Sequence, residues 1–170
     1  MKNSTLLFVT TFLLFIASCT KDKLPKATQS GKNTFGCKID GKVFTPSESG
    51  GLFGSPPITV YNDPFNGFTL LGKYYGDRSD KISKNIIISL LYLKTTDTYQ
   101  LSSYPYGQYE LDYSGGPIYR TNNTYTGQVN ITRCDTIKRI YSGTFSFKAV
   151  DRNTGKVVNV TDGRFDVKQQ

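Results

Sequence analysis

Residues 139–151 read RIYSGTFSFKAVD, and apolar and polar side chains alternate along them. Successive side chains of a β-strand point to opposite faces, so a period of two indicates a half-buried strand. The expected buried face carries Tyr141, Phe145, Phe147 and Ala149. A strand with one apolar face needs partner strands to bury it, so the flanking sequence is expected to repeat the period.

Strand-like segments do recur on both sides of this stretch. They are residues 34–39, 42–45, 58–61, 68–75, 84–93, 97–101, 124–134 and 156–167. Residues 86–93 read IIISLLYL, which fits a central strand or a short helix, and the β-branched triplet favours the strand. The sequence therefore predicts an all-β domain, an antiparallel β-sandwich or flattened barrel of about eight to nine strands.

Turn residues set the expected connections. Asp40-Gly41 is a favoured pair for a two-residue hairpin turn, and Asp162-Gly163 repeats it. At the second pair, Val158 and Val160 are out of phase with Phe165 and Val167, which predicts a bulge or tight turn. Residues 102–120 contain several glycines and prolines and are expected to form an irregular loop.

The first residues have the order of a secretory signal: a lysine, an apolar run over residues 6–16, and the small pair Ala17-Ser18 before Cys19. We expect a signal helix that is cleaved. Ile16-Ala17-Ser18-Cys19 resembles a bacterial lipobox, which implies cleavage before Cys19 and lipid on its sulfur and new amine. The alternatives are a transmembrane anchor, for which the run is short, or a plain signal peptide.

These patterns predict three parts of the chain. Residues 1–18 are a lipoprotein signal peptide, 19–33 are the lipidated cysteine and a polar, disordered tether, and 34–170 are a single β domain. The N-terminal lipid makes the membrane the expected partner, with two or more acyl chains giving stable anchoring.

Composition argues against catalysis and against nucleic acid. The chain has no histidine, the commonest general base and metal ligand, and only two glutamates, Glu48 and Glu110. Its net charge of +8 comes from scattered lysines and arginines rather than a basic run. We expect a protein that is not an enzyme, with no cofactor, no metal site and no nucleic-acid partner.

Two further residue groups are candidate sites. Cys37 and Cys134 form a disulfide or stay as two separate thiols, and the exported compartment permits the bond. Tyr104, Tyr106 and Tyr109 lie in the segment 102–120 and suit stacking on a glycan or a partner protein. The other interpretation of these tyrosines is that they cover an open sheet face.

Four stretches carry a family resemblance: TFGCKIDGKVF at 34–44, GQVNITRCD at 127–135, IYSGTFSF at 140–147 and VTDGRF at 160–165. Together they resemble a family of uncharacterised envelope lipoproteins of Bacteroidota that contain a domain of unknown function. The resemblance implies an all-β fold and brings no catalytic residues.

Two short motifs are similar to signals of the same group. Thr20-Lys21-Asp22 resembles a surface-export signal, although Lys23 stands where a second acid is expected. Asp135-Thr136-Ile137 resembles an O-glycosylation site at Thr136, or else is an ordinary turn.

The function expected from these features is a non-catalytic one. The protein is predicted to be an envelope lipoprotein, anchored in the outer membrane with its face undecided, whose β domain binds an envelope partner or has a structural role. The alternative is a surface glycan-binding accessory protein that uses the tyrosine-rich segment 102–120.

Overall fold

The computed structural model describes residues 23–48, 55–76, 82–112 and 115–170, and in these ranges the chain forms strands and no helix. The strands are β1 (Thr34–Ile39), β2 (Lys42–Phe44), β3 (Ile58–Asp63), β4 (Gly67–Tyr74), β5 (Ser83–Leu90), β6 (Thr98–Leu101), β7 (Tyr106–Asp112), β8 (Ile118–Arg120), β9 (Gly127–Asp135), β10 (Ile140–Asp151) and β11 (Val157–Lys168). The expected all-β class is confirmed.

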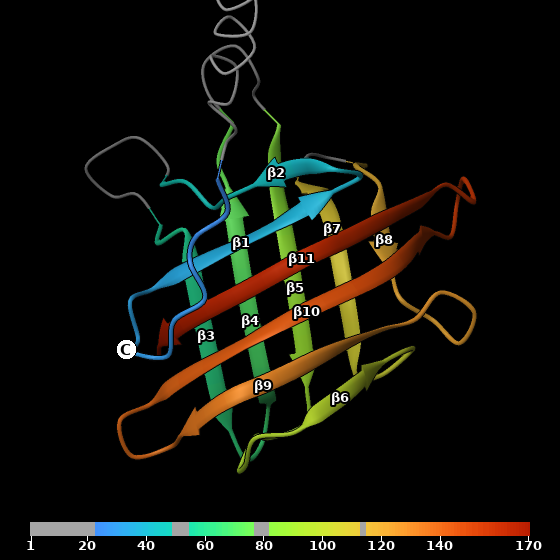
Figure 1. Ribbon diagram of the computed structural model, residues 1–170. Coiled ribbons are helices and arrows are strands. Elements are labelled where there is room, and N and C mark those ends of the chain that lie inside the picture. Colours follow the sequence, from blue (N-terminus) through green and yellow to red (C-terminus); the bar gives the residue numbers. More distant parts are fainter. Residues whose placement is uncertain (1–22, 49–54, 77–81, 113–114) are drawn as a thin grey trace, which may run out of the picture.

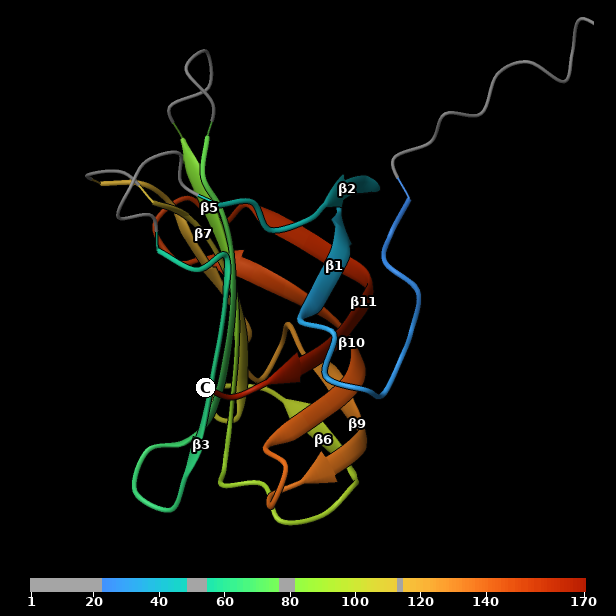
Figure 2. The same cartoon turned by 90° about the vertical axis from the view of Figure 1, so that its left-hand side faces the viewer.

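The strands form one curled antiparallel sheet in the order β2-β1-β11-β10-β8-β7-β5-β4-β3, with β9 paired to β10 and β6 to β9. Figures 1 and 2 show how it curls into two layers. We call β2, β1, β11, β10, β9 and β6 the front layer, and β3, β4, β5 and β7 the back layer. The sheet turns between them at β8, which pairs with the end of β10 and with β7. This is the predicted sandwich or flattened barrel.

The core lies between the two layers and is dominated by aromatic rings. Tyr141, Phe145 and Phe147 are each at most 4% exposed, which confirms the predicted inward face of β10. The ring of Phe145 lies 5.4 Å from that of Phe35 on β1 and 6.4 Å from that of Phe165 on β11, between centroids. Phe147 reaches the back layer at Gly107, where a Cβ atom would come within 2.7 Å of the ring.

The aspartates of both Asp-Gly pairs have a left-handed backbone, but only the first pair makes a hairpin. Asp40 and Gly41 have φ angles of 47° and 80° and join β1 to β2, as predicted. Asp162 has a φ angle of 54° and lies inside β11. There the pairing of β11 with β10 shifts register between Phe145 and Phe147. The predicted bulge is confirmed, and the prediction of a second hairpin turn at Asp162-Gly163 is wrong.

The segment 102–120 is more regular than predicted, because it contains β7 and β8. Gly107, Tyr109 and Leu111 alternate with polar residues along β7, and Gly107 and Tyr109 are buried. The apolar alternation along β7 is interrupted in the sequence because a glycine stands at the inward position 107. The ring of Phe147 fills the space that a side chain would take there. These two strands raise the number of strands above the expected eight to nine.

The prediction that the tether is disordered is wrong for residues 23–33. Residues 24–32, which we call the N-terminal strap, lie against the outer face of the front layer (Figure 2). The strap packs closely on Gly36 of β1, where a Cβ atom would come within 2.6 Å of Pro25 Cδ. The physical reason is a set of hydrogen bonds to a buried carboxylate on β11, described below.

Cys37 and Cys134 are free thiols, so of the two alternatives the disulfide is wrong. They lie on β1 and β9, and β11 and β10 stand between these strands in the sheet. Three strand spacings of about 4.8 Å separate the two cysteines by roughly 14 Å. A disulfide requires Cα atoms within about 7 Å.

The predicted signal helix and the lipid site at Cys19 lie outside the described residues. Within the described ranges, no helix has the length and apolarity that a membrane crossing requires.

Candidate functional site

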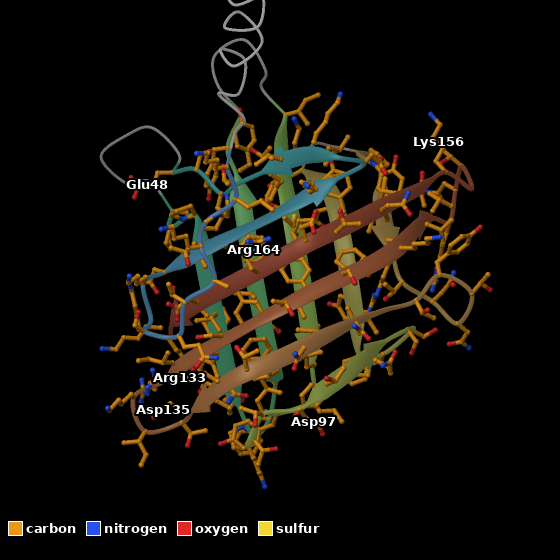
Figure 3. The ribbon with its side chains drawn as sticks, viewed as in Figure 1. Glu48, Asp97, Arg133, Asp135, Lys156 and Arg164 are labelled. Carbon is orange, nitrogen blue, oxygen red and sulfur yellow. The ribbon has the colours of Figure 1, made fainter. Side chains whose placement is uncertain are left out.

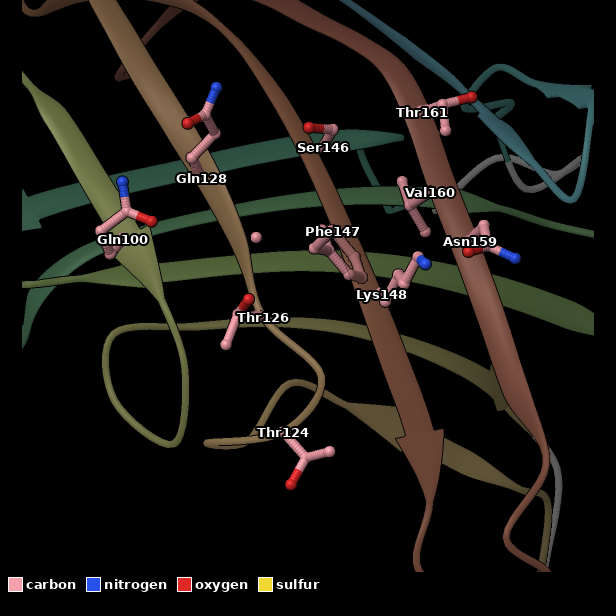
Figure 4. A pocket seen from close by; sticks show the side chains of 11 residues that line it. Gln100, Thr124, Thr126, Gln128, Ser146, Phe147, Lys148, Asn159, Val160 and Thr161 are labelled. Atoms are coloured by element: carbon pink, nitrogen blue, oxygen red, sulfur yellow. The ribbon is translucent and has the colours of Figure 1, made fainter.

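A polar groove of about 570 Å³ lies on the outer face of the front layer, across β6, β9, β10 and β11 (Figure 4). Most of its lining side chains are amides and hydroxyls, and they are exposed or half-buried. The lining residues are Gln100, Thr124, Thr126, Gly127, Gln128, Ser146, Phe147, Lys148, Asn159, Val160 and Thr161.

Strand register brings the polar side chains of the groove into rows. Gln100 on β6 is paired with Gln128 on β9, which is paired with Ser146 on β10. Lys148 on β10 is paired with Asn159 on β11. Because paired residues point to the same face of a sheet, each row presents its side chains together to solvent.

The bulge shapes the β11 side of the groove. The register of β10 and β11 steps from the Phe145–Gly163 pair to the Phe147–Val160 pair, so Thr161 and Asp162 lie opposite Ser146 without a regular partner on β10. A bulge bends its strand and increases the local twist. Below the polar rows, Phe147 and Val160 are 3% and 0% exposed, and they belong to the core rather than to the accessible surface of the groove.

The lining offers hydrogen bonds but little charge. Lys148 is the charged residue of the lining, and no carboxylate takes part. Amide side chains supply both donors and acceptors, and hydroxyls do the same. Such a surface can bind an uncharged polar ligand. It contains no base, nucleophile pair or ligand set for a metal, and no group of three or more metal-ligating residues occurs elsewhere among the described residues.

The tyrosine candidates do not form one site. Tyr104 is 52% exposed, Tyr106 is half-buried, and Tyr109 is 9% exposed. The rings of Tyr104 and Tyr106 lie 6.4 Å apart, whereas Tyr109 points to the core side of β7 and stacks on Tyr119 at 5.7 Å. Tyr104 and Tyr106 thus lie together as predicted, whereas Tyr109 belongs to the core.

One face of Tyr106 is already occupied. The guanidinium carbon of Arg120 lies 3.4 Å from the centroid of the Tyr106 ring, a cation–π contact between β8 and β7. A sugar ring that stacked on this face would have to displace Arg120. Tyr104 is therefore the one member of the predicted set whose ring is largely open to a ligand.

Thermal melts of alanine variants test this division of the tyrosines. We expect Tyr104→Ala to change the free energy of unfolding by less than about 0.5 kcal/mol, as at ordinary surface positions. Tyr109→Ala should cost more than about 2 kcal/mol, because it removes a buried ring and leaves a cavity. Equal losses in the two variants would show that Tyr104 also covers the core.

Comparison with known families adds one result to this geometry. Residues 83–167 match a family described as a domain of unknown function, DUF6252. The chain belongs to this family. The DUF6252 match runs from β5 into β11 and contains every residue that lines the groove. No curated protein and no solved structure matches the chain.

Asp166, within the DUF6252 region, holds the N-terminal strap. It is 1% exposed, and its carboxylate accepts five hydrogen bonds. The Thr28 hydroxyl donates at 2.6 Å, and the backbone N–H groups of Ser30, Gly31 and Lys32 donate at 3.0, 2.7 and 3.3 Å. The Ser142 hydroxyl on β10 completes the set at 2.8 Å.

The surroundings of Asp166 fix its charge. Burial raises its pKa, but the hydrogen bonds led by that from Thr28 lower it further, and the resulting pKa is about 2. The strap has a second attachment lower on the front layer. The Arg133 guanidinium donates to the backbone oxygen of Gln29 and forms an ion pair of 2.8 Å with Asp135 (Figure 3).

The remaining predicted residues lie apart from the groove. Cys37 is buried in the core, and burial raises the pKa of its thiol. Cys134 is half-buried on β9, where burial and the charge of Asp135 raise its pKa. Both thiols are therefore protonated at neutral pH. Thr136 is exposed in the turn between β9 and β10, so a modifying enzyme can reach it.

Sequence reasoning missed the groove and Asp166. The groove residues are the polar, outward-facing residues of the alternating strands. The alternation predicts only that such residues face solvent, and it does not predict a binding site. The available signal was the uncharged polar character of Gln128, Ser146, Asn159 and Thr161, at positions where charged residues are common on exposed strands. Nothing local marks Asp166, since the strap residues that bind it are more than 130 positions away.

Proposed function

We propose that this protein is a lipid-anchored lipoprotein of the bacterial cell envelope whose β domain is a non-catalytic binding module. The N-terminal pattern that ends at Cys19 supports the anchor. The polar groove, which lacks acid–base groups, supports binding rather than catalysis. We place the anchor in the outer membrane, as the resemblance to envelope lipoproteins of Bacteroidota suggests, and leave its periplasmic or surface face open.

The observation that carries the proposal is the N-terminal strap. A chain that only linked a domain to a lipid would need no fixed path, yet the strap is held by Asp166 and Arg133 and packs on Gly36. Leu24, where the strap begins, follows Cys19 by five residues. Five residues span at most about 18 Å. An anchor at Cys19 would therefore hold the domain close to the bilayer.

Fatty-acid labelling tests the anchor. Cells that express the full chain are fed an alkyne fatty acid, and the protein is purified and reacted with a fluorescent azide. We expect Cys19→Ala to abolish the label, because this cysteine receives the lipid and its acyl chains give the membrane affinity. The matched control is Cys134→Ala, which should keep full label. Equal label in the Cys19 variant and the wild type would end the lipoprotein proposal.

A second role, glycan binding at the surface, is favoured by the lining of the groove, which is mostly amides and hydroxyls with Lys148 as its charged residue. The sequence predicts Tyr104, Tyr106 and Tyr109 for this role, and the burial of Tyr109 removes one of these residues. The exposed Thr136 remains a proposed O-glycosylation site. Detection of a glycan on the 135–137 turn by mass spectrometry, and its loss in Thr136→Ala, would test that assignment.

A further inference from the structure

We propose that the groove on the front layer binds a neutral oligosaccharide chain, laid across β6, β9, β10 and β11. The inference rests on the proposed binding role and names its ligand class. It depends on where the polar side chains lie, on what the groove lacks and on its size.

The polar side chains of the groove are available to a ligand. No described residue hydrogen-bonds to the side chains of Gln100, Gln128 or Ser146, which form the row across β6, β9 and β10. Amides and hydroxyls both donate and accept hydrogen bonds, and so do the hydroxyls of a sugar. A row of such groups can therefore bind successive hydroxyls without the desolvation cost of an unpaired charge.

The groove excludes the other common classes of polymer. Nucleic acid is held mainly by lysine and arginine contacts to phosphates, and Lys148 is the one cation of this lining. A peptide strand binds to the free edge of a sheet, whereas the groove lies on a sheet face whose β9 and β10 are paired with each other. A lipid chain needs apolar walls, and Phe147 and Val160 are 3% and 0% exposed.

The dimensions suit a short stretch of a chain-like ligand. The volume of about 570 Å³ lies within the range of about 300–1,000 Å³ that is typical of small-molecule sites. From β6 to β11 the groove crosses three strand spacings, roughly 14 Å in all. Thr124 and Thr126 lie at one side of this path, and Thr161 lies at its β11 end (Figure 4). The ligand is thus elongated and rich in hydroxyl groups.

The chain offers a matched control on the same strand. Gln128 and Asn130 are both exposed on β9 and point to the same face, two residues apart. Gln128 lines the groove, and Asn130 pairs instead with Thr98 and Thr144 outside it. A Gln100→Ala/Gln128→Ala double variant removes two amides of the row, and Asn130→Ala removes one amide beside it.

The test uses the full-length protein in detergent and an array of neutral oligosaccharides, namely α- and β-glucans, xylans and mannans, followed by calorimetry with the best binder. We expect at least one of these glycans to bind. The double variant should bind it at least tenfold more weakly, and Asn130→Ala should stay within twofold of wild type. The affinity of the wild type should change less than threefold between low and high salt, because a neutral ligand forms no ion pair that salt could screen. Melting temperatures verify that all variants fold.

Three results would overturn the inference: no neutral glycan binds, the double variant binds like wild type, or high salt abolishes binding, which would indicate an anionic ligand. The test does not depend on lipidation. Failure here together with normal labelling at Cys19 would reject the glycan and keep the lipoprotein. Glycan binding by a protein whose Cys19 carries no label would keep the glycan site and reject the lipoprotein.

Discussion

Replacement of Phe145 or Phe147 by alanine is expected to lower the free energy of unfolding by about 3–5 kcal/mol, since each variant removes a buried ring and leaves a cavity. Phe145 lies among the rings of Phe35, Phe147 and Phe165, at centroid distances of 5.4, 6.4 and 6.4 Å. Phe147 fills the space left by Gly107 and so joins the front layer to the back layer. Chemical denaturation of the two variants measures the loss.

The neighbouring outward residues of β10 provide the control. Thr144 is exposed and Ser146 is half-buried on the opposite face of the strand. Thr144→Ala and Ser146→Ala should each change the free energy of unfolding by less than about 0.5 kcal/mol. If the outward and inward pairs lose stability equally, the register of β10 against β9 and β11 is incorrect.

Replacement of Asp166 by asparagine should release the N-terminal strap. In the wild type, the carboxylate accepts hydrogen bonds from donors of the strap at distances of 2.6 to 3.3 Å. The amide removes the negative charge and turns an NH₂ group, itself a donor, toward these donors. Hydrogen bonds to a charged group contribute about 1.5–3 kcal/mol, and several donors lose their partner together, so we expect a loss of about 2–4 kcal/mol. Trypsin should then cleave after Lys26 and Lys32 at least tenfold faster than in wild type.

Acid should reproduce part of this effect. The pKa of Asp166 in the folded protein, about 2, lies below its ordinary value of 3.8. A carboxylate with a lowered pKa stabilises the fold fully above the ordinary pKa, and the stabilisation is lost as pH falls through the folded pKa. Tryptic sites cannot be assayed at such pH, so pepsin cleavage of the strap is the measurement. Its rate should rise between about pH 4 and pH 2 in wild type and vary much less in Asp166→Asn.

Asp162→Asn is the matched control for the strap. Asp162 is on the same strand and forms an ion pair of 2.9 Å with Lys38, but its side chain is 48% exposed. Exposed ion pairs contribute at most about 1 kcal/mol. Cleavage of the strap should stay at the wild-type rate in this variant. Fast cleavage in Asp162→Asn, or slow cleavage in Asp166→Asn, would show that Asp166 does not hold the strap.

The sequence predicted those parts of the fold that follow from local patterns. The alternation over residues 139–151 identified β10 and its inward face, because one buried face forces a period of two. Asp40-Gly41 identified a hairpin turn because it can adopt positive φ at both central positions. The phase change between Val160 and Phe165 located the bulge at Asp162, since one extra residue moves every later side chain to the other face.

The features that the sequence did not predict depend on contacts between residues that are distant in the sequence. The strand β7 was missed because Gly107 occupies an inward position that the ring of Phe147 fills from the other layer. The strap was predicted to be disordered because its polar residues bury little apolar area, but Asp166 binds it through hydrogen bonds instead. The groove is formed by register across four strands, and the polar residues of one strand alone do not reveal it.

The mass of the mature N-terminal peptide decides whether the domain is held at a membrane by its own chain. Trypsin cleavage at Lys21 of protein purified from membranes should release Cys19-Thr20-Lys21. The lipoprotein proposal predicts this peptide with a diacylglyceryl group on the sulfur and an acyl chain on the amine. A mature chain that starts at another residue, or an unmodified Cys19, would contradict it.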